Sequence, residues 1–407
     1  MCDSAETIER RASAVREAAS VLRAVPIEQR AQWLAKSADQ LLHQVDQQGT
    51  ALARSSGLSP PMVSWAAKTT LRTIEQKGLA ALAARAEDPR ATPIAMLAVI
   101  LAGNVFTACI RASVVPLLLG VPVLLKSSSR ETLFPAMLAD ALRRVNPQLG
   151  AALDVVTFEG GDPESEAALV EAAEAVAVYG SDQTVASIGK RSGGREVIGH
   201  GHGVSAAYCA REALAEAHIE DTVKNLALDI GAYDQRGCLS PQVVYVQADD
   251  GCPALAFAHR LAAEGLEPLG QKLPRGPLPP SVGAVQAQWR GLAEVESTLI
   301  TGPSYAICIR PGGLPRWSPG YRNVTVMPVE SAAEALKLME PFATSLKCLG
   351  TDDPSRADVE SRLARSDSLR AYVCNLGRMQ TPPLDAPADG RPVWHGLLRR
   401  QTPMKRR

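Results

Sequence analysis

Apolar positions along the chain are spaced in two ways, which separate a helical N-terminal stretch from a region of alternating strands and helices. Over residues 6–88 they recur at helical intervals among Ala, Leu, Glu, Arg and Gln, the pattern of amphipathic helices. Residues 57–61, Gly-Leu-Ser-Pro-Pro, interrupt this pattern, because Gly and Pro end helices. Helices are therefore expected on both sides of the break.

Short apolar runs follow residue 93, and helical spacing returns between them. The runs cover residues 94–101, 121–125, 153–157 and 175–179, and the helical stretches cover residues 105–119, 133–144 and 166–173. Strands that alternate with helices predict a parallel, doubly wound α/β sheet. A second α/β unit is expected after Gly203, with strands at 243–246 and 324–329, paired strands within 298–310, helices at 252–264 and 331–339, and a Pro- and Gly-rich loop at 268–280.

The carboxyl ends of the first set of strands carry candidate ligand-binding residues, because ligands of such sheets bind at that edge. They are Gly103, Asn104, Lys126, Ser127, Gly180 and Ser181. The amide of Asn104 suits a developing oxyanion, although Asn is also common in turns. Lys126 beside serines suits a nucleotide ribose or phosphate, or it is an ordinary strand-end lysine. Gly180 and Ser181 precede a helical stretch whose N-terminus would attract phosphate, or they form a plain turn.

Cys238 is a candidate nucleophile. It follows Gly237 and lies just before the predicted strand at 243–246, a position that can expose both its sulfur and its backbone N–H. Arg236 would lower the pKa of the thiol, and the thiolate is the attacking form. The alternative is a buried cysteine that packs as a small apolar residue. The cysteines in apolar settings fit that alternative better, namely Cys109, Cys209, Cys308, Cys348 and Cys374.

Two histidines, His200 and His202, lie in the stretch Gly-His-Gly-His-Gly at residues 199–203. Histidines two apart can bind a metal, but the neighbouring sequence offers no third ligand. A flexible turn that lets the backbone approach a ligand is the preferred interpretation. No metal is therefore predicted. No G-x-G-x-x-G motif follows a predicted strand either, so the ordinary dinucleotide-binding motif is absent.

Composition narrows the class of protein. Lys plus Arg and Asp plus Glu are both 43 and aromatic residues make up 4%, which disfavours nucleic-acid binding. The eight cysteines include no C-x-x-C pair, so free thiols in the cytoplasm are expected. The N-terminus has no signal-peptide pattern, and residues 94–125 are too interrupted for a membrane span. The basic residues of 399–407 are expected to be solvated.

Several of these motifs resemble a known family. Residues 100–129, with Gly103-Asn104 and Leu-Leu-Lys-Ser-Ser at 124–128, resemble the aldehyde dehydrogenase superfamily, as does Tyr179-Gly180-Ser181. The stretches Asp-Gln-Arg-Gly-Cys-Leu-Ser-Pro at 234–241, Leu-Gly-Arg-Met-Gln-Thr-Pro-Pro-Leu-Asp at 376–385 and Asp-Gly-Arg-Pro at 389–392 resemble one branch, the long-chain fatty acyl-CoA reductases of bacterial bioluminescence systems. The similarity runs from about residue 94 to about residue 395.

The resemblance implies an aldehyde dehydrogenase-like α/β fold. Residues 1–206 would hold the N-terminal helices and a Rossmann-like cofactor domain, residues 207–374 a catalytic domain with Cys238, and residues 375–407 a return segment and basic tail. A small oligomerising element implies a homo-oligomer. The implied cofactor is NADPH, with NADH as the alternative. The implied partners are an acyl-CoA substrate and an acyl-protein synthetase or carrier protein.

The resemblance also implies roles for the site residues. Cys238 would be the nucleophile, and Asn104 with the backbone N–H of Cys238 would form the oxyanion hole. Lys126 and Ser127 would contact the adenosine ribose or its phosphate. Gly180 and Ser181 would lie near the pyrophosphate.

Two glutamates typical of the aldehyde-oxidising relatives are missing. The water-activating glutamate has no counterpart in residues 199–205, and no Glu-x-Phe-Gly-Pro motif, which positions the nicotinamide, precedes Val324. A reductase has no use for a base that activates water. The sequence therefore predicts reduction of a fatty acyl-CoA, or another acyl thioester, to the aldehyde through an acyl-cysteine. The alternatives are a non-catalytic dehydrogenase-like scaffold and an aldehyde-oxidising dehydrogenase.

Overall fold

The N-terminal stretch is helical, as its pattern predicts. The computed structural model describes residues 2–248 and 251–400. Within residues 2–90 the helices are α1 (Ala5–Ala24), α2 (Ile27–Ser56), α3 (Pro60–Leu71) and α4 (Gln76–Ala86). Gly57 ends α2 with a φ of 66°, and Ser59 caps α3 by accepting a bond from the backbone N–H of Met62. The predicted break is thus one short turn, because Pro60 starts a new helix instead of extending the loop.

A parallel sheet follows, built in the described residues from five strands in the order β4-β3-β2-β5-β6. They are β2 (Leu97–Ile100), β3 (Val123–Lys126), β4 (Leu153–Val156), β5 (Ala175–Tyr179) and β6 (Glu196–His200). The connecting helices are α5 (Ala108–Leu118), α6 (Leu133–Val145), α7 (Pro147–Ala151), α8 (Pro163–Ala172) and α9 (Asp182–Arg191). Alternate residues of β2 point to opposite faces of the sheet and enter two hydrophobic cores. Leu97 and Val99 pack in the core with α2 to α6, whereas Ala98 and Ile100 pack in the core with α1 and α8.

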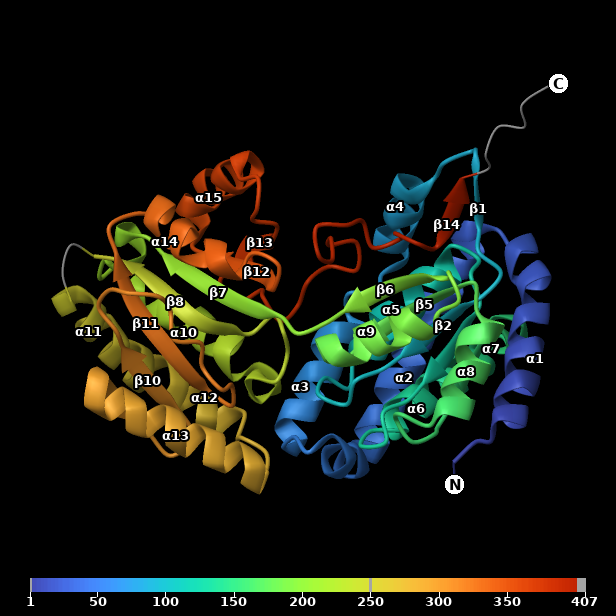
Figure 1. The fold of residues 1–407 in the computed structure, drawn as a ribbon, viewed down its shortest axis with the longest axis horizontal. Helices are drawn as coiled ribbons and strands as arrows, with labels where there is room; N and C mark the ends of the chain where they lie inside the picture. Colours follow the sequence, from blue (N-terminus) through green and yellow to red (C-terminus); the bar gives the residue numbers. More distant parts are fainter. Residues whose placement is uncertain (1, 249–250, 401–407) are drawn as a thin grey trace.

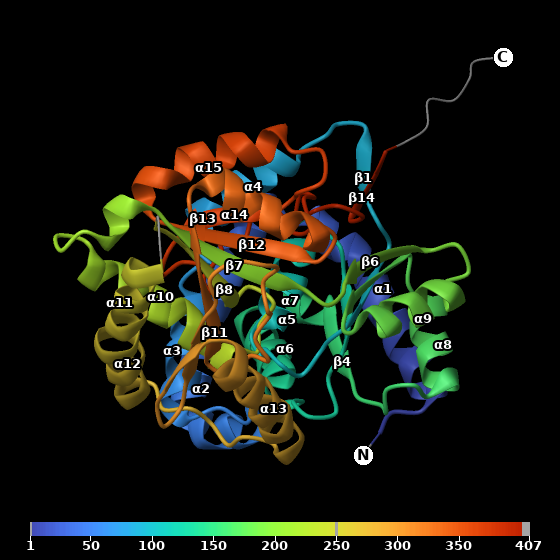
Figure 2. The ribbon, with the colours of Figure 1, turned by 60° about the vertical axis from the view of Figure 1, so that its left-hand side comes forward.

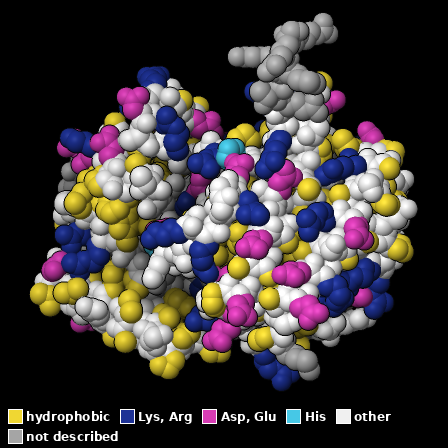
Figure 3. Space-filling model, turned by 45° about the vertical axis from the view of Figure 1, so that its right-hand side comes forward, with side chains coloured by type: hydrophobic (Ala, Val, Ile, Leu, Met, Phe, Trp, Pro, Cys, Tyr) yellow, Lys and Arg dark blue, Asp and Glu magenta, His cyan; other side chains and the backbone are white. Residues whose placement is uncertain are grey.

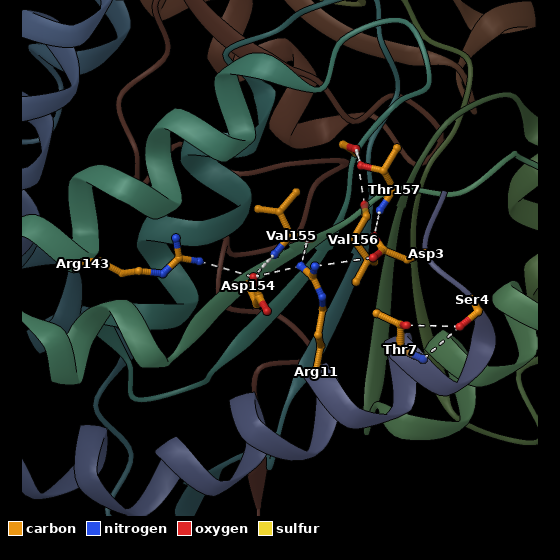
Figure 4. Close-up of polar contacts among 10 residues, drawn as sticks. Asp3, Ser4, Thr7, Arg11, Arg143, Asp154, Val155, Val156 and Thr157 are labelled. Carbon is orange, nitrogen blue, oxygen red and sulfur yellow. Dashed lines mark hydrogen bonds and ion pairs between the residues drawn. The ribbon is translucent and has the colours of Figure 1, made fainter. Parts of the chain in front are cut away.

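Polar contacts fasten the chain start to this sheet (Figure 4). Asp3 donates its backbone N–H to the carbonyl of Thr157 at 2.7 Å and accepts the N–H of Thr157 at 2.8 Å. Arg11 donates to the carbonyl of Val155 at 2.8 Å. These bonds hold α1 against the end of β4, where its apolar face covers the sheet.

A second sheet carries the rest of the chain, with seven described strands in the order β13-β12-β7-β8-β11-β10-β9. They are β7 (Val204–Cys209), β8 (Pro241–Gln247), β9 (Thr298–Thr301), β10 (Ala306–Ile309), β11 (Asn323–Val329), β12 (Leu346–Thr351) and β13 (Tyr372–Asn375). Strand β9 is antiparallel to β10, and the other pairs are parallel. The paired strands expected within residues 298–310 are therefore β9 and β10.

Helices cover both faces of the second sheet. They are α10 (Ile219–Gly231), α11 (Gly251–Arg260), α12 (Glu267–Lys272), α13 (Pro280–Glu296), α14 (Ala332–Met339) and α15 (Asp353–Arg365). Shorter helical turns occupy Arg211–Leu214, Ala232–Gln235, Leu261–Leu266 and Glu340–Phe342. The loop predicted to start at residue 268 is wrong at its beginning. The turn Leu261–Leu266 joins α11 to α12, and Pro268 fits in the first turn of α12, where proline costs no hydrogen bond.

The two sheets form two lobes, which Figures 1 and 2 show from different sides. The chain passes from β6 to β7 through residues 201–203, and it returns after β13 so that β14 (Leu398–Arg400) pairs with β1 (Ala91–Pro93). At the start of the tail Arg399 and Arg400 are exposed, as expected, and they form surface ion pairs with Glu174 and Asp88. Residues 401–407 lie outside the described residues. Among the helices that are described, none has the length and apolar character needed to cross a membrane.

Candidate active site

A cleft of about 1610 Å³ lies between the two lobes, at the carboxyl ends of strands of the first sheet and the amino ends of strands of the second. Figure 3 shows the molecule hollowed between the lobes, with Lys and Arg side chains beside the hollow. Of the residues predicted from the sequence, Asn104, Gly180, Ser181 and Cys238 line this cleft together. Lys126 and Ser127 are not among the residues that line it. Gly103 also lines the cleft, so the structure unites five of the seven candidate residues.

Cys238 lies on the loop before β8 and is exposed to the cleft. Ser205 donates its hydroxyl to the backbone carbonyl of Cys238 at 2.7 Å. Asn104 donates one amide hydrogen to the carbonyl of Arg236 at 2.9 Å, which leaves the second hydrogen of that amide free for a ligand. Asn104 thus contacts the nucleophile loop, defined here as residues 232–240.

The backbone of the nucleophile loop is strained. Tyr233, Asp234 and Gln235 have φ angles of 51°, 54° and 56°, and the left-handed region costs roughly 1–2 kcal/mol for each residue with a side chain. The buried guanidinium of Arg322 donates to Asp234 at 2.8 Å. Gln235 donates to the carbonyls of Pro241 and Asn323 at 2.8 Å each. Strain of this kind persists only where surrounding contacts hold it, and it clusters at functional sites.

The protein around Cys238 raises the pKa of its thiol above the ordinary value. Burial within the cleft walls is the main cause, the charge of Asp389 adds to it, and Lys347 opposes it. The residue can be reached from the cleft, and the surrounding protein replaces part of the water that would stabilise a thiolate. The expectation that Arg236 lowers this pKa is wrong, since its guanidinium donates instead to the carbonyls of Ser56 and Tyr233 at 3.0 and 3.2 Å.

Sequence reasoning did not assign a role to three polar residues of the cleft, His200, Lys347 and Asp389. Lys347 of β12 forms an ion pair with Asp389, and His200 Nδ1 lies 3.2 Å from Asp389 Oδ2. Burial alone would raise the pKa of Asp389, but His200 and Lys347 lower it to about 2. Asp389 was part of a motif quoted for the family resemblance, and His200 of the stretch without the glutamate, so the sequence marked both places but neither role.

A metal is not suggested by these contacts. His200 is engaged with Asp389, and the backbone N–H of His202 donates to Asp182 at 2.8 Å. Over residues 2–248 and 251–400, no group of three or more His, Cys, Asp or Glu is arranged to hold a metal ion.

The turn between β5 and α9 has the donors that a nucleotide diphosphate needs. Ser181 caps α9 by accepting the N–H of Thr184 at 3.1 Å. The N–H groups of Asp182 and Gln183 also belong to the first turn, which has no acceptors within its own helix. The carboxylate of Asp182 accepts the backbone N–H of His202, and its remaining negative charge opposes a phosphate. A role for Gly180 and Ser181 in holding the pyrophosphate stays a prediction.

Lys126 and Ser127 lie at the end of β3, at the edge of the first sheet. Lys126 is 6% exposed, and its Nζ lies 5.2 Å from the ring centroid of Phe158. Burial lowers the pKa of this lysine. The hydroxyl of Ser127 donates to the carbonyl of Val156 at 3.3 Å. A role for either residue in binding adenosine stays a prediction.

Another part of the cleft is apolar. Ile110, Ala112 and Val115 of α5 line it, together with Leu384, Val393 and Leu397 of the returning C-terminal segment. This wall suits the hydrocarbon part of a substrate.

The fold defines the class of protein. Similar solved structures include aldehyde dehydrogenase 21 from Physcomitrella patens, with 15% identity, a TM-score of 0.75, and coverage of 98% of this chain and 90% of that chain. A salicylaldehyde dehydrogenase from Pseudomonas putida G7 has 15% identity and a TM-score of 0.74, over 100% and 92% of the two chains. The glyceraldehyde-3-phosphate dehydrogenase GapN from Methanocaldococcus jannaschii, complexed with NADP, has 15% identity and a TM-score of 0.73, over 98% and 94%. The chain has the aldehyde dehydrogenase fold, as predicted.

The family follows from the sequence match. The family model described as acyl-CoA reductase (LuxC) matches residues 83–399, and the chain belongs to this family. A search of the curated proteins finds no match. Membership confirms the predicted resemblance, and with it the prediction that this protein is an enzyme that reduces fatty acyl thioesters.

Proposed function

We propose that this protein reduces a fatty acyl-CoA to the aldehyde with NADPH, and that Cys238 carries the acyl group between the two half-reactions. The observation that carries this proposal is the position of Cys238. It is exposed to a cleft that also contains Asn104 and the N-terminal turn of α9. The proposed nucleophile, the proposed oxyanion donor and the proposed site for the nucleotide phosphates thus all face the same cleft.

In the first half-reaction, Cys238 Sγ attacks the thioester carbonyl and coenzyme A leaves. The free amide hydrogen of Asn104 and the backbone N–H of Cys238 stabilise the oxyanion that forms. Exchange of one thioester for another is nearly isoenergetic, so positioning matters more than strong acid chemistry. The bonds from Ser205 and Asn104 to the nucleophile loop supply that positioning.

In the second half-reaction, the acyl group leaves Cys238 as the aldehyde. Gly180 and Ser181 would hold the nucleotide diphosphate, and Lys126 and Ser127 the adenosine ribose or its phosphate. Bound there, NADPH supplies the hydride that reduces the thioester carbon. The NADP in the Methanocaldococcus jannaschii relative supports this nucleotide. No glutamate occupies residues 199–205, so this stretch holds no carboxylate base. Such a base would activate water to hydrolyse the acyl-cysteine to the acid.

Three finer features are part of the same proposal. The chain divides at residues 206 and 374 into cofactor, catalytic and return units. The protein works in the cytoplasm as a homo-oligomer. An acyl-protein synthetase or a carrier protein can replace coenzyme A as the acyl donor, since Cys238 reacts only with the thioester.

NADPH oxidation with butyryl-, decanoyl- and hexadecanoyl-CoA tests the proposal, with the product analysed as aldehyde or acid. Cys238→Ala is expected to abolish oxidation while NADPH still binds, because only the nucleophile is lost. Cys2→Ala, which removes an exposed cysteine outside the cleft, should leave the rate unchanged. Turnover by Cys238→Ala would disprove the acyl-cysteine. Reduction of NADP with decanal as the substrate, with the acid as product, would favour the aldehyde-oxidising alternative. No turnover of acyl-CoA or aldehyde by the wild type would favour the scaffold.

A further inference from the structure

Three side chains that the proposed reaction does not use form a series of contacts in the cleft. His200 of β6 bonds Asp389 Oδ2 through Nδ1 at 3.2 Å, and Asp389 Oδ1 pairs with Lys347 of β12. All three line the cleft that exposes Cys238. The series therefore connects elements of both lobes through the returning C-terminal segment.

The contacts determine which nitrogen of His200 carries hydrogen. Asp389 is ionised near neutral pH, because His200 and Lys347 lower its pKa to about 2 against the effect of burial. A carboxylate only accepts hydrogen bonds, so Nδ1 of His200 must donate and Nε2 keeps its lone pair. Across the described residues, no hydrogen bond to His200 Nε2 is formed. Tyr179 stacks on the ring, with centroids 4.4 Å apart and planes 22° apart, and holds its orientation.

Cys238 lies in the electrostatic field of the same groups. Asp389 raises the pKa of the thiol and Lys347 opposes that effect, after burial as the main cause. Burial raises the pKa of Tyr179 to about 12, with the charges of Cys238 and Asp389 adding to it and Arg111 opposing them. Because its pKa is raised, Cys238 is mostly a neutral thiol near pH 7, and its attack needs a base.

We propose that His200 is the base for Cys238 and that Asp389 and Lys347 position it, an inference that rests on the proposed function. Nε2 takes the proton from Cys238 Sγ, and the freed electron pair forms the bond from sulfur to the acyl carbon. The bond from that carbon to the sulfur of coenzyme A breaks. His200 returns the proton to this leaving sulfur, so coenzyme A departs as a thiol and the imidazole is neutral again.

Charge alternates along the series during the transfer. Cys238 is negative, His200 positive, Asp389 negative and Lys347 positive, which stabilises the separated ions in a cleft with little water. Other titratable or charged groups near the series include Tyr179 of β5, Arg111 of α5, Tyr372 of β13 and Asp385 of the returning segment. His202, Arg391 and His395 line the same cleft. A carboxylate behind a histidine that faces a nucleophile is a recurring arrangement for proton transfer.

Acyl transfer without NADPH tests this role. Rapid-quench mass spectrometry of the full-length protein with decanoyl-CoA measures how fast the acyl group appears on Cys238. His200→Gln is expected to slow this step roughly 100-fold or more at pH 7. The rate of the variant should then rise roughly tenfold per pH unit below the pKa of the thiol, because it depends on the free thiolate. The wild-type rate should change less.

Matched variants separate proton transfer from packing. Asp389 has a φ of 53°, which Asn adopts readily, so Asp389→Asn should fold normally, lose most of the acyl transfer rate and keep its melting temperature. His218→Gln removes an exposed imidazole at the start of α10, outside the cleft, and should leave the rate unchanged. If His200→Gln does not fold, Asp389→Asn carries the same test of rate against pH.

The possible outcomes separate the role of His200 as a base from the proposed acyl-CoA reductase function on which that role depends. Wild-type rates in His200→Gln and Asp389→Asn would overturn the inference, and so would slower rates with a wild-type pH slope, since a ring that only packs would give that result. A wild-type protein that gains no acyl group on Cys238 would instead overturn the proposed function. Iodoacetamide alkylation of Cys238 over the same pH range then shows, without an acyl substrate, whether His200 affects the thiol.

Discussion

Two regions deliver polar groups to the same cleft, the turn between β5 and α9 and the nucleophile loop, and they are built differently. The first has ordinary backbone angles, with Ser181 at φ −70° and ψ 158°, and the bonds of its helix cap join residues three apart. The second has three successive residues in the left-handed region, held by partners far away in the sequence such as Ser56 and Asn323. The conformation of the turn between β5 and α9 can therefore be predicted from its local sequence. The conformation of the nucleophile loop depends on contacts that form only in the folded chain.

The difference fits the tasks of the two regions. A nucleotide diphosphate can be held by any well-capped helix N-terminus. A nucleophile must meet its electrophile within narrow limits of distance and angle. Strain held by distant contacts gives that rigidity, at a cost in stability that the rest of the fold offsets.

The strongest way to break the nucleophile loop is to remove its buried ion pair. Arg322 and Asp234 are each 1% exposed, and Arg322→Met leaves the carboxylate of Asp234 without its cation. Loss of one partner of a buried pair costs about 3–5 kcal/mol. Thermal unfolding should show a melting temperature lower by several degrees, with a reduced turnover number from the loosened loop.

Glu220→Gln is the matched control for that variant. It removes an exposed ion pair with Lys224 within α10, and exposed pairs contribute little. Its melting temperature should stay at the wild-type value. If Arg322→Met melted like this control, the nucleophile loop would not depend on its distant partners, and the contrast between the two regions would fail.

Asn104 connects the first sheet to the nucleophile loop and provides the next largest effect. Asn104→Ala removes both the bond to the carbonyl of Arg236 and the proposed oxyanion donor. Loss of one such donor lowers the turnover number by about 100- to 1,000-fold. Steady-state kinetics and NADPH fluorescence should show that loss with an unchanged dissociation constant for NADPH. A turnover number within a factor of two of wild type would contradict the oxyanion role. Asn104 would then be an ordinary turn residue, the alternative given in the sequence analysis.

The sequence predicted the fold well where its signals are local. The run at 175–179 coincides with β5, and the runs at 121–125 and 153–157 differ from β3 and β4 by one or two residues. Continuous apolar runs and turn residues suffice for β3 and β5, because these strands are buried on both faces. The missed helix α13 (Pro280–Glu296) has few buried residues, so its apolar pattern is weak.

The site was predictable only in part. Asn104, Gly180 and Ser181 follow strands of the first sheet, and the edge rule for parallel sheets brings them together. Cys238 precedes β8 of the second sheet, and the rule does not place it in the cleft. Lys126 follows the same rule but is absent from the cleft lining, because strand position does not give the direction of a long side chain. Lys347 and Asp389 come from segments far from Cys238 in the chain, and no local pattern indicates that they meet.

The cap of α9 gives the smallest effect and the sharpest comparison, because the chain holds a second cap of the same kind. Ser181 caps α9 and Ser59 caps α3, each by accepting a backbone N–H three residues on. Replacing either serine by Ala costs about 1 kcal/mol, so both variants should melt a few degrees lower. Of the two serines, only Ser181 lies in the cleft. Loss of its cap should let the first turn of α9 fray, so that its backbone N–H groups no longer point at the phosphates. NADPH binding should therefore weaken several-fold in Ser181→Ala but not in Ser59→Ala. Equal dissociation constants for NADPH in the two variants would mean that the turn after β5 caps a helix without holding phosphate, and the nucleotide would then need another site along the first sheet.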